Sequence, residues 1–301
     1  MPSTMGPGLS SLDPALVARI GSLELIARSV VEGFLAGLHR SPFKGFSVEF
    51  SEYRQYLPGD DPARIDWKLV ARSDRYYVKE FEEETNLECH LLLDVSGSMG
   101  YGSHSVTKLR YGVFLAAALA YLMHRQRDSV GLTLFDERVV ESFSVGSRRG
   151  HLRTLLSALS HARVGARSDV SKPLGQLAAR LRRRGLVVLI SDLLDEPAGI
   201  IQGLKHLRFR GSEVLVFHIL DPAELTFPFE HAARFEDLET TAQVVAVPDL
   251  VRRHYLGEID ALQERYRREL GLANIDYHLL NTARPLDGAL LSYLSTRGRR
   301  M

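Results

Sequence analysis

The chain has 301 residues, a length that suits one large domain or two modest ones. Apolar residues make up 45% and charged residues 25%, which allows a buried core and excludes disorder of the whole chain. The net charge of +1 gives no reason to expect nucleic acid or an anionic membrane as a partner. The single cysteine, Cys89, excludes an internal disulfide framework and a multi-cysteine metal site, and it favours a reducing compartment.

The start of the chain has no features of a targeting signal. Residues 1–11 are small and polar, and no cationic segment leads into an apolar one, as it would in a secretory signal. The longest apolar stretch, Tyr111 to Met123, is shorter than the roughly 18 residues of a membrane span and predicts a buried helix. We therefore expect a cytoplasmic protein without a membrane span, in which residues 1–12 form a disordered leader.

Residues 13–84 are predicted to form an extension that begins with a helix and continues as an irregular segment. Asp13-Pro14 has the form of a helix start, and apolar residues at helical spacing continue to about residue 39, with a break expected near Gly21. From residue 41 to residue 73 the apolar residues follow neither a helical nor a strand periodicity, although the aromatic side chains there argue against disorder. Residues 76–83 then read as a strand that turns into the next one.

From residue 85 onward, apolar strands alternate with helices. Strands are expected at 87–94, 130–135, 139–143, 186–190, 213–220 and 275–280, and helices at 107–127, 152–159, 172–184, 198–208, 249–270 and 286–296. Continuous apolar strands separated by helices are typical of a mostly parallel sheet that is covered on both faces. We therefore predict a doubly wound α/β domain over residues 85–301, with its site beyond the carboxyl ends of the strands.

Polar side chains follow the central strands of this predicted sheet. A D-x-S-x-S turn comes directly after the first strand, an aspartate follows a later strand, and a serine lies on the loop between them. Two carboxylates and three hydroxyls are hard oxygen ligands, which suit Mg²⁺ or Mn²⁺ and not zinc. The sequence predicts a metal site with one coordination position open to a partner's carboxylate. Its five residues are Asp94, Ser96, Ser98, Ser168 and Asp192.

A purely structural role for the same residues is the alternative. Asp94 and Asp192 would then cap the N-termini of helices, while Ser96 and Ser98 would satisfy the backbone of a turn.

The D-x-S-x-S turn, together with an aspartate after a later strand, resembles the von Willebrand factor type A domain. The metal-ion-dependent adhesion site of that family combines this turn, a hydroxyl from a second loop and the later aspartate. The resemblance implies the same five metal ligands. Ser168 departs from the family pattern, because the residue on the second loop is usually threonine, but it keeps the hydroxyl.

The extension carries a more distinctive set of residues. They are Phe43-Lys44-Gly45, Glu49-Phe50, Arg54-x-Tyr56-x-Pro58-Gly59-Asp60-Asp61, Arg64-Ile65-Asp66-Trp67-Lys68, Ala71-Arg72 and Val78-Lys79-Glu80-Phe81-Glu82. From residue 41 to the C-terminus, the chain resembles the "domain of unknown function 58" family. The similarity includes Arg234-Phe235-Glu236-Asp237-Leu238-Glu239 and the closing Pro285-Leu286-Asp287-x-Ala289-Leu290. Proteins of that family contain a type A domain and are commonly associated with MoxR-type AAA ATPases. The resemblance implies a binding or adaptor role and not a reaction.

Other chemistry is weakly indicated. The 11 histidines are scattered without an H-E-x-x-H motif, and the sequence has no nucleophile elbow or Walker loop. The basic runs at 180–184 and 297–300 are interpreted as solvated helix ends. Read without the family, residues 41–84 form a structural clasp of paired charges and aromatic side chains, which is compatible with a partner-binding surface.

Three functional hypotheses follow. The main one is a non-enzymatic, metal-dependent adaptor that binds the Asp or Glu of a protein partner, with a MoxR-type AAA ATPase as the expected partner. The alternative is a Mg²⁺- or Mn²⁺-dependent phosphoester hydrolase at the same rim, although no general base is found beside Asp94. In the third, the rim binds no metal and the extension alone makes the contacts.

Overall fold

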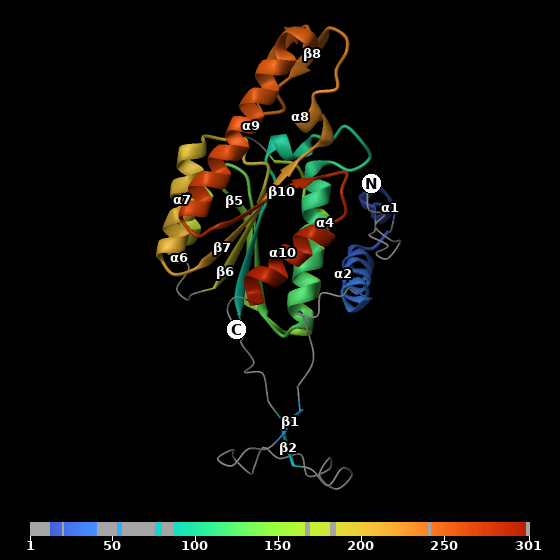
Figure 1. Cartoon of the computed structure of the whole chain (residues 1–301), viewed down its shortest axis with the longest axis vertical. Coiled ribbons are helices and arrows are strands. Elements are labelled where there is room, and N and C mark those ends of the chain that lie inside the picture. Colours follow the sequence, from blue (N-terminus) through green and yellow to red (C-terminus); the bar gives the residue numbers. More distant parts are fainter. Residues whose placement is uncertain are drawn as a thin grey trace, which may run out of the picture. The chain divides into compact units, whose positions relative to one another are not determined.

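The structure is a computed structural model and divides into two compact units (Figure 1). The larger unit contains residues 1–41 and 87–301, and the smaller contains residues 42–86. The described residues are 13–19, 21–40, 53–55, 76–79, 87–165, 169–180, 185–239 and 242–298.

The smaller unit contains an antiparallel pair of short strands. Strand β1 (Tyr53–Gln55) pairs with β2 (Tyr77–Lys79). The sequence predicted a strand at residues 76–83; the structure describes residues 76–79 of this range, in which β2 pairs with β1. The predicted clasp lies mostly outside the described residues.

The helical start of the chain belongs with the larger unit. After the short helix α1 (Pro14–Val17), helix α2 (Leu23–Arg40) packs against helix α4 (Lys108–Arg125). The break between α1 and α2 falls at Gly21, as predicted. The sequence assigned this helical part to an extension over residues 13–84, whereas the structure groups it with the sheet. The leader predicted for residues 1–12 lies outside the described residues.

A sheet of six strands forms the centre of the described part of the larger unit. Its order is β10-β7-β6-β3-β4-β5. The strands are β3 (Glu88–Asp94), β4 (Ser129–Phe135), β5 (Val139–Gly146), β6 (Leu186–Ser191), β7 (Glu213–Leu220) and β10 (Asp276–Asn281). All pairs are parallel except β4 with β5. The centres of β3, β6 and β7 are buried apolar runs (residues 91–93, 186–190 and 214–217), and the predicted doubly wound, mostly parallel sheet is confirmed.

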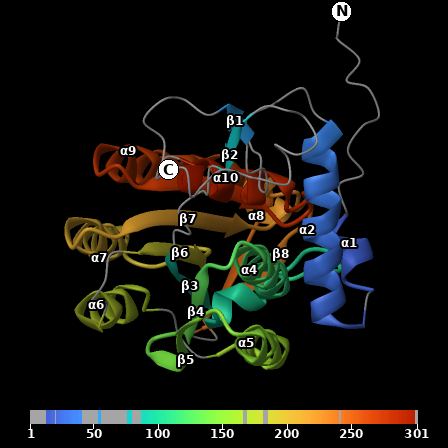
Figure 2. The same cartoon turned by 90° about the horizontal axis from the view of Figure 1, so that it is seen from below.

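Helices cover both faces of the sheet (Figure 2). Helix α4 packs on β3 and β4, with α5 (Arg149–His161) and α10 (Asp287–Gly298) on the same side. A Cβ atom at Gly112 of α4 would lie 2.9 Å from Leu93 Cδ1, so glycine lets the helix approach the sheet closely. None of the described helices is long and apolar enough to cross a membrane. The cytoplasmic location remains a prediction.

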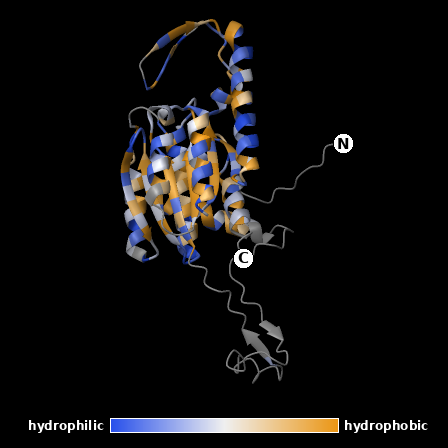
Figure 3. Ribbon diagram, turned by 90° about the vertical axis from the view of Figure 1, so that its left-hand side faces the viewer, coloured by the Kyte–Doolittle hydropathy of each residue, from blue (hydrophilic) through white to orange (hydrophobic). Residues whose placement is uncertain are grey.

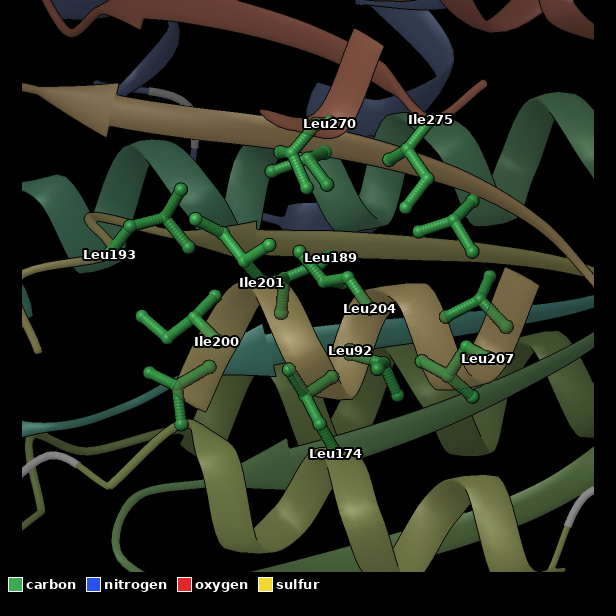
Figure 4. Close-up of a cluster of buried hydrophobic side chains, with 14 of the residues drawn as sticks. Leu92, Leu174, Leu189, Leu193, Ile200, Ile201, Leu204, Leu207, Leu270 and Ile275 are labelled. Atoms are coloured by element: carbon green, nitrogen blue, oxygen red, sulfur yellow. The ribbon is translucent and has the colours of Figure 1, made fainter. Parts of the chain in front are cut away.

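The opposite face carries a second apolar layer. It is covered by α6 (Ser171–Arg180), α7 (Pro197–Phe209) and α9 (Pro248–Leu272). Leu92 and Leu189 of the sheet share one buried cluster with Leu204 of α7 and Leu270 of α9 (Figure 4). Two apolar layers around one sheet hold the strand ends in fixed positions, which is the condition for a preformed site there.

Some elements at the carboxyl edge of the sheet were not predicted. They are the 3₁₀ helix η2 (Gly97–Gly100), helix α8 (Pro222–Thr226), and the hairpin of β8 (Ala233–Glu236) and β9 (Gln243–Ala246). The hairpin lies outside the central sheet, and parts of its ribbon have the hydrophobic colour in Figure 3. Because Val244 and Val245 are 63% and 77% exposed, no buried alternation marked this segment as strand.

Candidate metal centre

Asp94 stands at the carboxyl end of β3 and is fully buried. Its Oδ1 accepts a hydrogen bond from the Ser96 backbone N–H at 2.9 Å. Its Oδ2 accepts one from Ser191 Oγ, at the end of β6, at 2.6 Å. The carboxylate of Asp94 is therefore held between the ends of two neighbouring parallel strands.

The two serines of the D-x-S-x-S turn point toward each other. Ser96 is buried and Ser98 is half-buried, and their Oγ atoms lie 3.2 Å apart. The last two residues of the turn, Gly97 and Ser98, are already part of η2, for which Ser96 is the N-cap residue. Two adjacent hydroxyls beside a carboxylate are donors that one hard cation can share.

Asp192 follows β6 and is also fully buried. Its Oδ1 accepts a hydrogen bond from the Leu194 N–H at 3.3 Å. Burial, together with the negative charge of Asp192, raises the pKa of Asp94 to about 7. Asp94 Oδ2 is contacted by Ser191, the residue directly before Asp192, so the two aspartates lie at the ends of neighbouring strands.

Lys108 is the counter-charge of this neighbourhood. Its side chain is only 1% exposed, and its Nζ donates to Asp192 Oδ2 at 2.8 Å and to Glu224 Oε1 at 2.6 Å. Burial alone would lower the pKa of Lys108, but attraction to Asp192 and Glu224 raises it. Lys108 therefore neutralises one of the two carboxylates that it contacts, and Asp94 lies nearby without a contact to it. A local excess of negative charge remains, which favours an added cation.

Glu224 is fixed by helix α8. In the capping box of that helix, Glu224 Oε2 accepts from the Asp221 N–H at 2.7 Å, while Asp221 Oδ1 accepts from the Ala223 N–H at 2.8 Å. Burial raises the pKa of Glu224, and Lys108 opposes that shift. Helix α8 therefore positions one of the two partners that hold Lys108.

Ser168, the fifth predicted ligand, lies outside the described residues. The described residues on either side of it contact the two turns of the site. The Gly165 N–H donates to the Val95 carbonyl at 2.6 Å, and the Val170 N–H donates to Asp195 Oδ2 at 3.0 Å. Its role as a ligand stays a prediction.

Sequence reasoning missed Lys108, Glu224 and Glu239. The sequence holds one indication of the role of Lys108. A cation in the first turn of a helix is disfavoured by the helix dipole, so a lysine there indicates anions nearby that stabilise it. Glu239 lies beyond β8, and its Oε1 accepts from the Ser98 N–H at 3.4 Å. It had been singled out only as part of the family-like run 234–239.

The donor set fits a hard divalent ion. Asp94, Asp192, Ser96 and Ser98 offer only oxygen atoms, as Mg²⁺ and Mn²⁺ prefer. Among the described residues, no group of three or more histidine, cysteine, aspartate or glutamate side chains could hold a metal by itself. The arrangement relies on hydroxyls beside two carboxylates, and such a set is distinct from a zinc site.

The strand order and the D-x-S-x-S turn at the end of β3 define a von Willebrand factor type A-like domain. The chain belongs to the family described as "Protein of unknown function DUF58", whose model matches residues 52–265. It is 30% identical over 231 residues to uncharacterized proteins of Mycobacterium tuberculosis and Mycobacterium bovis, covering 76% of this chain and 72% of theirs.

One solved structure shares the fold of a large part of the chain. The conserved hypothetical protein BatB from Bacteroides thetaiotaomicron aligns with a TM-score of 0.52 at 15% identity, over 71% of this chain and 100% of that one. The VWA domain of Rpn10 aligns with a TM-score of 0.38 at 15% identity, over 69% of this chain and 94% of that one. The likeness to BatB extends to the fold alone.

Proposed function

We propose that this protein is a metal-dependent interaction module that binds a carboxylate of a protein partner through Mg²⁺ or Mn²⁺. Asp94, Asp192, Ser96 and Ser98 would hold the ion, with Ser168 as a third hydroxyl. Bound there, the ion would supply an electrophilic position for an incoming Asp or Glu. The single observation that carries the proposal is that Asp94 and Asp192 follow the neighbouring strands β3 and β6, joined by the Ser191–Asp94 hydrogen bond, beside the paired serine hydroxyls.

The charge balance supports a cation at this place. Two buried aspartates repel each other, and Lys108 already divides its charge between Asp192 and Glu224. Asp94 accepts hydrogen bonds from Ser96 and Ser191, and among the described residues it makes no ion pair with a lysine or arginine. A divalent ion beside Asp94 would relieve the repulsion that burial makes costly.

Exposed apolar side chains near the site support a protein as the partner. On the β8–β9 hairpin and the start of α9, five large apolar side chains are at least 49% exposed: Leu238, Val244, Val245, Val247 and Leu250. Grouped surface hydrophobics of this kind are typical of interaction sites. The hairpin also carries Glu239, which contacts the D-x-S-x-S turn. A partner that offers an acidic residue flanked by apolar ones would match both features.

The expected partner is a MoxR-type AAA ATPase, or a client that such an ATPase remodels. This part of the proposal rests on the family resemblance, in which type A domain proteins accompany such ATPases.

Asp94→Ala should abolish metal-dependent partner capture while leaving the fold intact. The tagged full chain is incubated with native lysate in Mg²⁺ or in EDTA, and the captured proteins are identified. We expect the wild type to capture a partner in Mg²⁺. In EDTA the captured amount should fall at least about tenfold, because the partner's carboxylate would lose the cation that binds it.

The matched control is Asp260→Ala, which removes an exposed carboxylate from α9 and should behave as the wild type. The proposal would be contradicted if Asp94→Ala in Mg²⁺, and the wild type in EDTA, both captured the partner as strongly as the wild type does in Mg²⁺. The phosphoester hydrolase alternative is tested with the same variant. Turnover of a generic phosphatase substrate that is lost in Asp94→Ala would favour the enzyme.

A further inference from the structure

The turn after β6 contains a residue in a backbone conformation that its side chain disfavours. Leu193 has a φ of 52°, in the left-handed region that residues other than glycine rarely adopt. Its side chain is fully buried and belongs to the apolar cluster of Figure 4. Such a conformation persists only where the surrounding structure holds it, and residues of this kind cluster at functional sites. Leu193 directly follows Asp192, one of the proposed metal ligands.

Two hydrogen bonds hold the backbone of Leu193. On one side, the Tyr266 hydroxyl of helix α9 donates to the Leu193 carbonyl at 3.1 Å, although the two residues are 73 positions apart in the chain. On the other side, the Leu193 N–H donates to Ser191 Oγ at 3.0 Å. Tyr266 and Ser191 are both fully buried. The left-handed residue is therefore fixed both from α9 and from the end of β6.

Ser191 connects this turn to Asp94. A serine hydroxyl carries one proton, and Ser191 Oγ donates that proton to Asp94 Oδ2 at 2.6 Å. Because Ser191 Oγ accepts from the Leu193 N–H, the direction of its own proton toward the carboxylate is set by the turn. A continuous chain of buried hydrogen bonds thus runs from Tyr266 of α9 to Asp94, the first residue of the D-x-S-x-S turn.

The ring of Tyr266 is held by its aromatic neighbours. It packs edge-on against His218 of β7, with ring centroids 5.9 Å apart, and it stacks on Tyr277 of β10 at 6.3 Å. Those two side chains also contact each other, since His218 Nδ1 lies 2.7 Å from the Tyr277 hydroxyl oxygen. The hydroxyl of Tyr266 therefore reaches Leu193 from a ring that strands β7 and β10 keep in one orientation.

We propose that Tyr266 is a positioning residue of the metal centre, which orients Asp94 through the Leu193 carbonyl and the Ser191 hydroxyl without touching the ion. Carboxylates that bind metals are commonly oriented by hydrogen bonds from a surrounding layer of residues, and loss of such a bond weakens metal binding. Ser191 is the nearer member of this layer and Tyr266 the more remote one. This inference rests on the proposed function, because it requires a metal ion beside Asp94.

The test compares Tyr266→Phe, which removes one hydroxyl and keeps the ring, with Ser191→Ala. Calorimetric titration of the purified full chain with Mn²⁺ measures the dissociation constant. It should rise about tenfold in Ser191→Ala and roughly fivefold in Tyr266→Phe, because Asp94 loses its orientation. Since both residues act along one chain of hydrogen bonds, Tyr266→Phe should add less than about twofold in the Ser191→Ala background. A tyrosine that only supports the core would not show this loss of additivity.

Tyr111→Phe is the matched control. The buried Tyr111 donates to the Arg284 carbonyl at the same distance of 3.1 Å, and it has no part in the chain of hydrogen bonds that leads to Asp94. Urea unfolding in EDTA should show that the two tyrosine variants lose a similar stability, roughly fivefold in the unfolding equilibrium constant. Only Tyr266→Phe should weaken the binding of Mn²⁺.

The outcomes separate the inference from the proposed function. If Tyr266→Phe or Ser191→Ala binds Mn²⁺ as tightly as the wild type, or if Tyr111→Phe weakens binding as much as Tyr266→Phe, the inference is overturned and the proposed function stands. Additive effects of Tyr266→Phe and Ser191→Ala also overturn it, because the two residues would then act separately. A wild-type chain that binds no Mn²⁺ overturns the inference and the proposed function together.

Discussion

Asp94→Asn should stabilise the metal-free protein by up to about 4 kcal/mol above pH 7. Burial and the charge of Asp192 raise the pKa of Asp94 from 3.8 to about 7. Each unit of such a shift corresponds to about 1.4 kcal/mol. Asparagine keeps the shape of the side chain, can still accept from the Ser96 N–H, and removes the buried charge.

The effect has a defined pH dependence. Because the folded-state pKa of Asp94 is raised, its protonated form stabilises the fold below about pH 4, and this stability is lost as the pH rises to about 7. Asparagine does not titrate, so the difference between variant and wild type should be near zero at pH 4 and reach a plateau above pH 7.

Urea unfolding in EDTA between pH 4 and pH 8 measures this difference. His218, whose pKa is lowered to about 4 mainly by burial, titrates in both proteins and cancels in the comparison. At pH 8, Mg²⁺ at about 100 times its dissociation constant should stabilise the wild type by about 2.7 kcal/mol and leave the variant unchanged. If the difference in unfolding free energy between variant and wild type is the same at every pH, the pKa of Asp94 is not raised in the folded protein and this prediction is wrong.

Lys108→Met should destabilise the metal-free protein by about 3–5 kcal/mol. Methionine retains an apolar stem, but Asp192 and Glu224 would lose the buried ammonium that binds both of them at 2.8 Å and 2.6 Å. The buried Asp192, which lies close to Asp94, and the largely buried Glu224 would then be left without their counter-charge. Chemical unfolding in EDTA at pH 7.5 measures the loss.

Lys205→Met is the matched control for this variant. Lys205 pairs with Glu269 at 3.0 Å, but the two side chains are 41% and 30% exposed. Surface pairs of this kind contribute about 0–1 kcal/mol, so the control should lose little stability. Equal losses in the two lysine variants would contradict the role of Lys108 as the counter-charge of the site.

The part of the site that follows from local pattern was predictable from sequence. Asp94 and Asp192 come directly after continuous apolar strands, and the carboxyl ends of parallel strands meet at one edge of a sheet. The doubly wound arrangement followed from the same strands and the helices between them. Periodicity and position were therefore enough to bring these two residues together.

The remaining parts depend on approaches between distant segments. Lys108 meets Asp192 across 84 positions and Glu224 across 116. Periodicity describes one element at a time, so it could not place a lysine of α4 and a glutamate of α8 at one point. The β8–β9 hairpin escaped prediction for a different reason, since its exposed valines lack the alternation of a half-buried strand.

Calorimetric titration with Mn²⁺ tests the central claim most directly. The claim is that oxygen donors at the ends of β3 and β6 hold one divalent ion. We predict that the wild-type chain binds one Mn²⁺ and that Asp94→Asn, at the same concentration and pH, binds none. Absence of binding to the wild type, or equal binding to the folded variant, would contradict the account.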